Sequence, residues 1–239
     1  MTHVSGASFI LNYSWGRGRI NRLDHKTGTN AKQAYLGRVI LRQHSEISIS
    51  RHMHIITPRM HLIPATLELL YAELQSSAAL SAFIGAYVPG HWPPALYDEP
   101  AIRWTIAQLS KPKVDGRWYL HYFVLQSRTS APDVVIGAGG YRGAPDPTGT
   151  VTIGYSILPE YQRRGLAAEA VAGLLQNAFI KQVKIVAADT LEGDPKSGGV
   201  LLKNGFRLTG PGPEPGTSHY ELTKAEWKAH LAAAQQISV

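Results

Sequence analysis

The stretch SILPEYQRRGLAAEAVAGLLQNAF, at residues 156–179, carries the residue types needed to hold an anion. An apolar strand pattern stops at Pro159, and an alanine-rich helix pattern begins near Gly165. The first amides of a helix lack intrahelical acceptors, and the helix dipole favours negative charge there by about 0.3–1 kcal/mol. Arg163 and Arg164 add positive charge on the approach. The pattern predicts a diphosphate site, although an ordinary basic strand-to-helix turn has the same spacing.

The elements on either side of this loop have patterns that would position it. The preceding strand places alternate apolar residues on one face, namely Val151, Ile153, Tyr155 and Ile157. The helix from Gly165 repeats apolar residues in two adjacent stripes. A helix with two such stripes faces a core. We therefore expect the loop to be held between a buried strand and a buried helix.

Patterns along the rest of the chain predict a mixed sheet with helices on its faces. Strands are expected at residues 54–64, 117–126, 133–141, 151–158, 183–190, 206–210 and 218–222. Helices are expected from near residue 66, over 98–110, from 165, over 197–204 and over 223–235. A run of antiparallel strands followed by a βαβα unit indicates an α+β (mixed α/β) fold.

Composition is typical of a globular protein, with 44% hydrophobic and 17% charged residues among 239. No apolar run approaches the roughly 18 residues of a membrane span, so we expect no membrane association. There is no cysteine, which excludes disulfides, thiolate metal sites and a thiol nucleophile. The absence of cysteine is typical of a reducing compartment, and we expect a cytoplasmic protein.

The net charge of +7 is concentrated at the N-terminus. Residues 1–52 contain eight basic and two acidic residues, whereas residues 53–239 contain 16 basic and 15 acidic residues. We expect 1–52 to be a disordered or loosely attached extension and 53–239 to be the folded domain. A transit peptide for organellar import, or a true start at Met53, would fit equally well. Nucleic-acid binding through this basic extension is the weaker interpretation of its charge.

Two blocks of sequence resemble the GNAT superfamily of N-acetyltransferases. The stretch QRRGLA, residues 162–167, resembles the family's acetyl-coenzyme A (acetyl-CoA) pyrophosphate loop, Q/R-x-x-G-x-G/A. The block GDPKSGGVLLKNGFRLTG resembles the segment N-x-x-S-x-x-x-x-x-K-x-G-F, with Asp194 in place of the Asn. The matching residues of that segment are Ser197, Lys203, Gly205 and Phe206. The likeness covers about residues 55–228 and looks closest to the branch that includes ribosomal-protein N-terminal acetyltransferases.

The resemblance implies a fold, a cofactor and a reaction. The fold would be a mostly antiparallel sheet of about six or seven strands, with a splayed central strand pair that admits acetyl-CoA. The reaction would move acetyl from acetyl-CoA to a primary amine by direct attack in a ternary complex. The acceptor would be a small molecule or a protein N-terminus. The resemblance leaves open whether the protein forms a homodimer. The implied cofactor-binding residues are Ile157, Leu158, Gln162, Arg163, Arg164, Gly165, Leu166, Ala167 and Asp194.

The catalytic groups are less well defined than the cofactor loop. Many family members have a tyrosine as proton donor four residues before the Gly of G-F, and here that position is Leu201. Ser197 is therefore the candidate catalytic residue, although a serine there could equally cap the short helix. Trp92 lies in the region that rims the family's acceptor groove, where it would stack on a substrate or simply pack. No base is assigned; the open candidates are Glu192, Asp194, Glu99 and Tyr220.

Two further interpretations concern function and metals. Because the usual tyrosine and an obvious base are both missing, a non-catalytic acyl-CoA-binding or sensing module is the alternative function. Three histidines, His52, His54 and His61, lie close together in the sequence without neighbouring acids or cysteines. We therefore expect no metal site.

Overall fold

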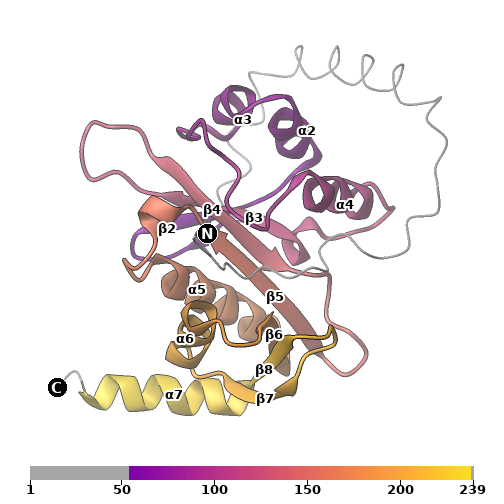
Figure 1. Ribbon diagram of the computed structural model, residues 1–239, viewed down its shortest axis with the longest axis vertical. Coiled ribbons are helices and arrows are strands. Elements are labelled where there is room, and N and C mark those ends of the chain that lie inside the picture. The colour runs from indigo at the N-terminus through magenta and orange to yellow at the C-terminus, as the bar shows by residue number, and fades with distance from the viewer. Residues whose placement is uncertain (1–53, 238–239) are drawn as a thin grey trace, which may run out of the picture.

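A mixed sheet organises residues 54–237, the part of the chain that the computed structural model describes (Figure 1). In this part the sheet has eight strands in the order β1-β2-β3-β4-β5-β6-β8-β7, and only the pairing of β5 with β6 is parallel. The strands are β1 (Ile55–Ile56), β2 (Met60–Pro64), β3 (Leu120–Leu125), β4 (Val134–Tyr141), β5 (Thr150–Ile157), β6 (Ile185–Leu191), β7 (Arg207–Pro211) and β8 (Thr217–Thr223). The expected α+β class and mostly antiparallel sheet are confirmed, with eight strands instead of six or seven.

The first expected strand, at residues 54–64, is in fact a hairpin. β1 pairs antiparallel with β2, and the chain turns between them at residues 57–59. Pro58 has no N–H to donate to a strand ladder, and its fixed φ favours a turn. The Thr57 N–H donates to the Met60 carbonyl at 2.9 Å, and the Met60 N–H donates to the Thr57 hydroxyl oxygen at 3.0 Å, which closes the turn.

Three helices cover one face of the sheet: α2 (Leu67–Gln75), α3 (Ser77–Ile84) and α4 (Glu99–Leu109). They pack on alternate residues of β3, including Leu120, Tyr122 and Val124. The side chain of the residue before each helix caps its N-terminus, namely Thr66 for α2, Ser76 for α3 and Asp98 for α4. The α3 helix was not predicted from the sequence; Ser76 separates it from α2, and its side chain accepts from the Ala79 N–H.

The opposite face is covered by α5 (Leu166–Ile180), α6 (Pro195–Lys203) and α7 (Lys224–Ile237). The alternate residues of β5 that the sequence placed on one face, including Ile153 and Tyr155, lie in this core against α5. Trp227 of α7 packs against Phe179 of α5, with ring centroids 5.0 Å apart. Two short 3-10 helices complete the fold: η2 (Gly116–Trp118) and η3 (Pro159–Tyr161).

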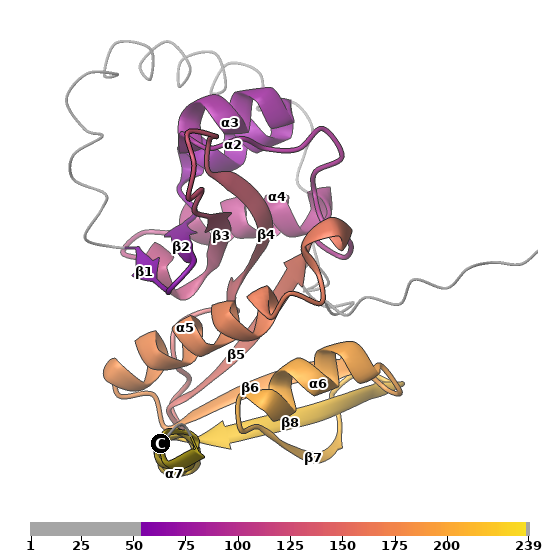
Figure 2. The same ribbon diagram turned by 90° about the vertical axis from the view of Figure 1, so that its left-hand side faces the viewer.

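The parallel strands β5 and β6 separate halfway along their length. They pair only from Thr150 with Ile185 to Ile153 with Ala188. Beyond that point, residues 154–157 pair with β4, and residues 189–191 pair with β8. Figure 2 shows the two strands diverging from the end at which they pair. The expected splayed central pair is therefore present, and it leaves two strand edges facing a gap.

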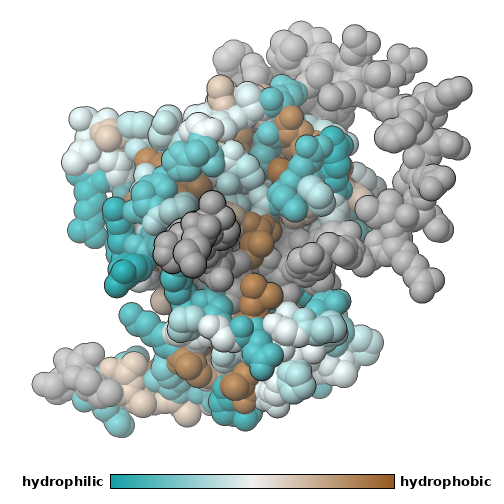
Figure 3. Space-filling model, viewed as in Figure 1, coloured by the Kyte–Doolittle hydropathy of each residue, from teal (hydrophilic) through white to brown (hydrophobic). Residues whose placement is uncertain are grey.

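Among residues 54–237, no helix is both long and apolar enough to cross a membrane. The face of the molecule in Figure 3 is mainly hydrophilic, with small separate hydrophobic patches. The predicted extension, residues 1–52, lies outside the described residues, as does His52 of the histidine group.

Candidate active site

A cavity of about 300 Å³ opens where β5 and β6 diverge. Its walls are the end of β5, the loop after it, the first turn of α5 and one side of α6. Of the residues expected to bind a cofactor, those in the wall are Ile157, Gln162, Arg163, Gly165, Leu166 and Ala167. Ser197, the candidate catalytic residue, also lines it. The tertiary structure thus brings the two sequence blocks together at one cavity.

The loop conformation exposes backbone amides at one end of this cavity. Arg163 and Gly165 both have left-handed backbone conformations, with φ of 58° and 75°. Gly165 is the N-cap of α5 and has no side chain to satisfy the first amides. The Glu169 N–H donates to the Gly165 carbonyl, so the amides of Leu166 and Ala167 precede the helical ladder. Together with the dipole of α5, these amides give this end of the cavity the donors that an anion requires.

Positive side chains also line the cavity. Arg163 lines the cavity from the loop, and Lys196 and Lys203 line it from the two ends of α6. None of the residues described along its wall is acidic. A chain that supplies three cations and a set of free amides has the donors that a diphosphate and a further phosphate require. The residues therefore fit the phosphates of a coenzyme A molecule.

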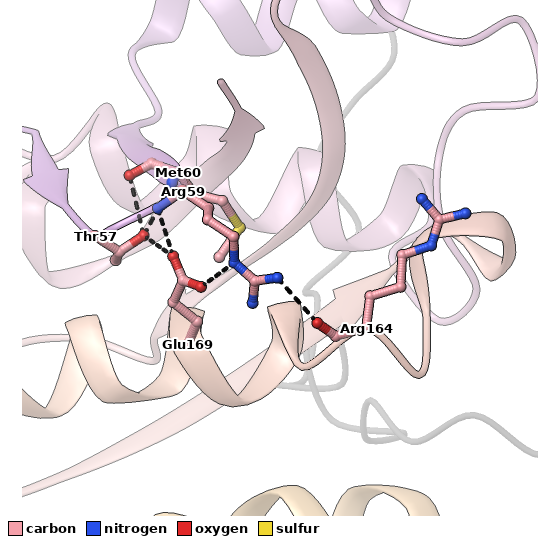
Figure 4. A network of polar contacts seen from close by, with 5 residues as sticks. All are labelled: Thr57, Arg59, Met60, Arg164 and Glu169. Carbon is pink, nitrogen blue, oxygen red and sulfur yellow. Dashed lines mark hydrogen bonds and ion pairs between the residues drawn. The ribbon is translucent and has the colours of Figure 1, made fainter. Parts of the chain in front are cut away.

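A clamp from the β1–β2 turn holds the loop in place, as Figure 4 shows. Glu169 of α5 accepts from the Thr57 hydroxyl at 2.7 Å, the Arg59 N–H at 2.8 Å and Arg59 Nε at 2.6 Å. Arg59 also donates to the Arg164 carbonyl at 3.1 Å. Burial acts to raise the pKa of Glu169, but the hydrogen bonds from Thr57 and Arg59 hold it below its usual value. Sequence reasoning missed this clamp, because its partners are more than 100 positions apart.

Three of the expected cofactor-binding residues lie outside the cavity wall. Leu158 is buried, and its N–H donates to the Ile136 carbonyl at 2.8 Å. The Arg164 guanidinium lies 5.5 Å from the centroid of the Tyr161 ring. Asp194 caps α6 by accepting from the Lys196 N–H at 2.8 Å. The other carboxylate oxygen of Asp194 is buried, and no described residue donates a hydrogen bond to it.

Ser197 occupies the third position of α6 and is 7% exposed. Because Asp194 makes the cap of this helix, the Ser197 hydroxyl is not its cap. The Tyr155 hydroxyl donates to the Ser197 carbonyl at 3.2 Å, and burial raises the pKa of Tyr155. Tyr155 also lines the cavity, although the sequence identified it only as a core residue. Leu201, at the position of the family's usual tyrosine, is fully buried and offers no proton.

Trp92 lies in the core beneath α2, α3 and α4 and is 9% exposed. Its indole N–H donates to the Glu73 carboxylate at 2.6 Å. The hydroxyls of Tyr97 and Tyr122 donate to the other oxygen of Glu73, at 2.8 and 2.6 Å. Burial raises the pKa of Glu73, although these three donors act in the opposite direction. The contacts of Trp92 in this structure are therefore packing contacts and one buried hydrogen bond.

The loop between Trp92 and Tyr97 also contacts the sheet beside the gap. The Ser156 hydroxyl on β5 donates to the Ala95 carbonyl at 2.8 Å. The buried Glu73 cluster therefore anchors a loop that borders β5.

The chain matches the family model described as the acetyltransferase (GNAT) domain over residues 59–207. It belongs to the GNAT acetyltransferase family. The match includes the loop at 162–167 and all the matching residues of the second block, so the resemblance inferred from those blocks is confirmed. No curated protein matches the chain.

Solved structures similar to this GNAT chain include three acetyltransferases. A GNAT-family enzyme from Bacillus anthracis is 16% identical, with a TM-score of 0.48 over 72% of this chain and 99% of that one. RimJ from Mycobacterium smegmatis, solved with CoA-disulfide, is 19% identical, with a TM-score of 0.47 over 74% and 89%. RimL, a ribosomal L7/L12 alpha-N-protein acetyltransferase, is 15% identical, with a TM-score of 0.49 over 71% and 93%. At these identities and scores, the family assignment rests on the family model alone.

Proposed function

We propose that this GNAT chain transfers an acetyl group from acetyl-CoA to a primary amine. The observation that carries the proposal is the cavity at the divergence of β5 and β6, closed at one end by the first amides of α5. One end of the cavity suits phosphates, and its side is an open strand edge. A long ligand with a phosphate end and an amide-containing arm suits such a cavity.

Different residues of the cavity would bind different phosphate groups of acetyl-CoA. The amides of Leu166 and Ala167, with Arg163, would hold the diphosphate, and Lys196 and Lys203 would hold further phosphate charge. Each charge-assisted hydrogen bond contributes roughly 1.5–3 kcal/mol. The Gln162 side chain donates to the Ile157 carbonyl at 2.8 Å and so joins the loop to the end of β5.

Bound acetyl-CoA supplies an activated acetyl thioester. The N–H groups on the β5 edge that β6 has left are the donors with which the chain can polarise the thioester carbonyl. Ser197 lines the same cavity and is our candidate for donating a proton to the leaving thiolate. Positioning the thioester and an amine in one ternary complex supplies a large part of the rate. The acceptor is a small amine or a protein N-terminus, and Trp92 supports the loop beside it.

Thiol release tests the proposal directly. The full chain, incubated with acetyl-CoA and a panel of amines and short peptides, should release free thiol with at least one class of amine. Acetyl-CoA binding is measured in parallel by calorimetry. Tight binding without turnover across the panel would favour a non-catalytic acyl-CoA sensor, since Leu201 replaces the family's usual tyrosine. Absence of binding would overturn the cavity assignment itself.

A further inference from the structure

A polar cluster lies on the sheet face opposite the cavity, at the point where β5 and β6 diverge. Ala188 and Tyr220 belong to the core beneath α5 and α6. Side chains alternate between faces along a strand, so Asp189 and His219 lie on the other face. Asp189 is the first residue of β6 beyond its pairing with β5, and His219 is its partner on β8.

This part of the face is outside both described cores. The core beneath α2, α3 and α4 contains residues of β3 and β4, and it includes none from β6, β7 or β8 among residues 54–237. The His219 side chain is 28% exposed, whereas that of Asp189 is 4% exposed. A molecule that approaches the gap from this face can therefore contact the imidazole while the carboxylate behind it stays covered.

The contacts within the cluster orient the imidazole. His219 Nδ1 lies 2.5 Å from an Asp189 carboxylate oxygen, and Nε2 lies 3.4 Å from a Glu221 carboxylate oxygen. Arg142 lies 3.8 Å from the other Asp189 oxygen, and Glu214 adds a further negative charge near Arg142. A neutral imidazole here donates from Nδ1 to Asp189, which leaves the lone pair on Nε2. A protonated imidazole can donate to both carboxylates.

We infer that His219, oriented by Asp189, accepts a proton from the acceptor amine on this face of the gap. This inference rests on the proposed acetyltransferase function and names its base. The cluster has three carboxylates and one guanidinium, so the acceptor it fits is a cationic amine.

The proton balance of the transfer follows from this assignment. The ammonium gives one proton to His219 Nε2, which later passes it to solvent. The nitrogen lone pair then forms the N–C bond with the acetyl carbon, and the C–S bond breaks with its electrons going to sulfur. The second nitrogen proton neutralises the thiolate. The products are an amide, a free thiol and one released proton.

Kinetics of matched variants test the assignment. The amines are spermidine and the tripeptide Ala-Ala-Ala, and the variants are His219→Asn and Asp189→Asn. The asparagine at 219 can still donate to Asp189 but cannot accept the proton. We expect the kcat of His219→Asn to fall roughly 100-fold at neutral pH. With the tripeptide, the difference in kcat between the wild type and His219→Asn should narrow as the pH rises above the pKa of a peptide amino terminus, about 8. Above that pH the amine is already deprotonated and needs no base.

His61→Asn is the matched control, since His61 lies on β2 and its ring contacts the Gln126 side chain at 3.0 Å. It should leave both kcat and its pH dependence unchanged. Calorimetry should show that His219→Asn binds acetyl-CoA as the wild type does. A deficit that is equal at every pH and accompanied by a lower melting temperature would mean a structural role and would overturn the inference.

A spectroscopic measurement gives a result that does not depend on turnover. Nitrogen-15 chemical shifts of the imidazole in the free protein should report the Nδ1–H tautomer of His219, and Asp189→Asn should alter them. The Nε2–H tautomer in the wild type would overturn the assignment. If the wild type released no thiol with any amine, the proposed function would fail and this inference with it. If the wild type and His219→Asn both released thiol with the same pH dependence of kcat, the assignment of His219 as the base would be refuted. The proposed acetyltransferase function would stand.

Discussion

Gly165 is the residue on which the conformation of the proposed anion loop, residues 162–167, depends most directly. Its φ of 75° lies in the left-handed region, and an ideal Cβ at this position would be 3.6 Å from the Arg59 guanidinium. There is thus room for a small side chain, but L-residues adopt this φ at a cost of roughly 1–2 kcal/mol. The glycine is therefore needed for its backbone conformation, and its lack of a side chain matters only against groups larger than a methyl.

Replacement of Gly165 separates these two requirements. Gly165→Ala carries the conformational cost alone, so we expect acetyl-CoA affinity to fall about tenfold or less. Gly165→Glu adds a carboxylate beside the amides that would hold the diphosphate, and we expect affinity to fall at least 100-fold, by roughly 3 kcal/mol. Calorimetric titration with acetyl-CoA measures both. Normal binding by Gly165→Glu would show that the ligand phosphates lie elsewhere.

At the scale of elements, the loop depends on a contact between the β1–β2 turn and α5. Glu169 is largely buried and accepts three hydrogen bonds from Thr57 and Arg59. The turn thereby holds the first turn of α5 and, through Arg59, the carbonyl of Arg164. The clamp could not be predicted from the local sequence pattern that predicts the loop, because its partners are far apart in the sequence.

Glu169→Gln should weaken both the fold and acetyl-CoA binding. Removing the charge of one partner should lower the free energy of unfolding by about 1–3 kcal/mol at neutral pH. Because the folded-state pKa of Glu169 is depressed, its stabilisation is present above the unfolded pKa and is lost as pH falls through the folded pKa. The difference between wild type and variant should therefore shrink below about pH 4.5. Denaturant titrations across this pH range measure it.

Glu226→Gln is the matched control. Glu226 accepts from the Thr223 N–H and hydroxyl and pairs with Arg207, a set of partners like that of Glu169. These hydrogen bonds lower the pKa of Glu226 to about 2. The control should show the same direction of pH dependence in stability while leaving acetyl-CoA affinity unchanged. Equal affinity in both variants would contradict a role for the clamp in shaping the loop.

At the scale of the whole molecule, the sheet buries polar groups between its two helical layers. His121 on β3 is 1% exposed, and its ring contacts that of Tyr141 edge to face. Its Nδ1 lies 3.1 Å from the Tyr119 carbonyl, which places the proton of the neutral ring on Nδ1. Burial lowers the pKa of His121 to about 4.

This burial predicts a pH dependence of global stability. The unfolded chain binds a proton at His121 below about pH 6.5, whereas the folded protein does so only near pH 4. Stability from this residue therefore falls as pH drops from 6.5 to 4, by the order of 3 kcal/mol, and is constant above. His121→Phe should remove that slope, and His91→Gln, with a side chain 59% exposed, should retain it. Denaturant unfolding at several pH values would contradict this if the wild type and His121→Phe had equal slopes.

The loop and its flanking elements could be predicted from sequence because their determinants are local. Alternation along β5, the glycine before α5 and the stripes of α5 each depend on neighbouring positions, and the structure has all three. Capping at Asp98 is local in the same way. The α3 helix and the β1–β2 hairpin were missed because Ser76 and Pro58 interrupt patterns that otherwise continue.

The sequence by itself determined the family and the fold class and predicted the residues of the anion loop, since those lie in contiguous motifs and periodic patterns. Only the tertiary structure decided which distant residues act on that loop and on the gap beside it. Arg59 meets Glu169, Tyr155 meets Ser197, and Asp189 meets His219 through strand register and helix packing. Such contacts depend on how separate elements are aligned in space, and no spacing along a single chain encodes that alignment locally.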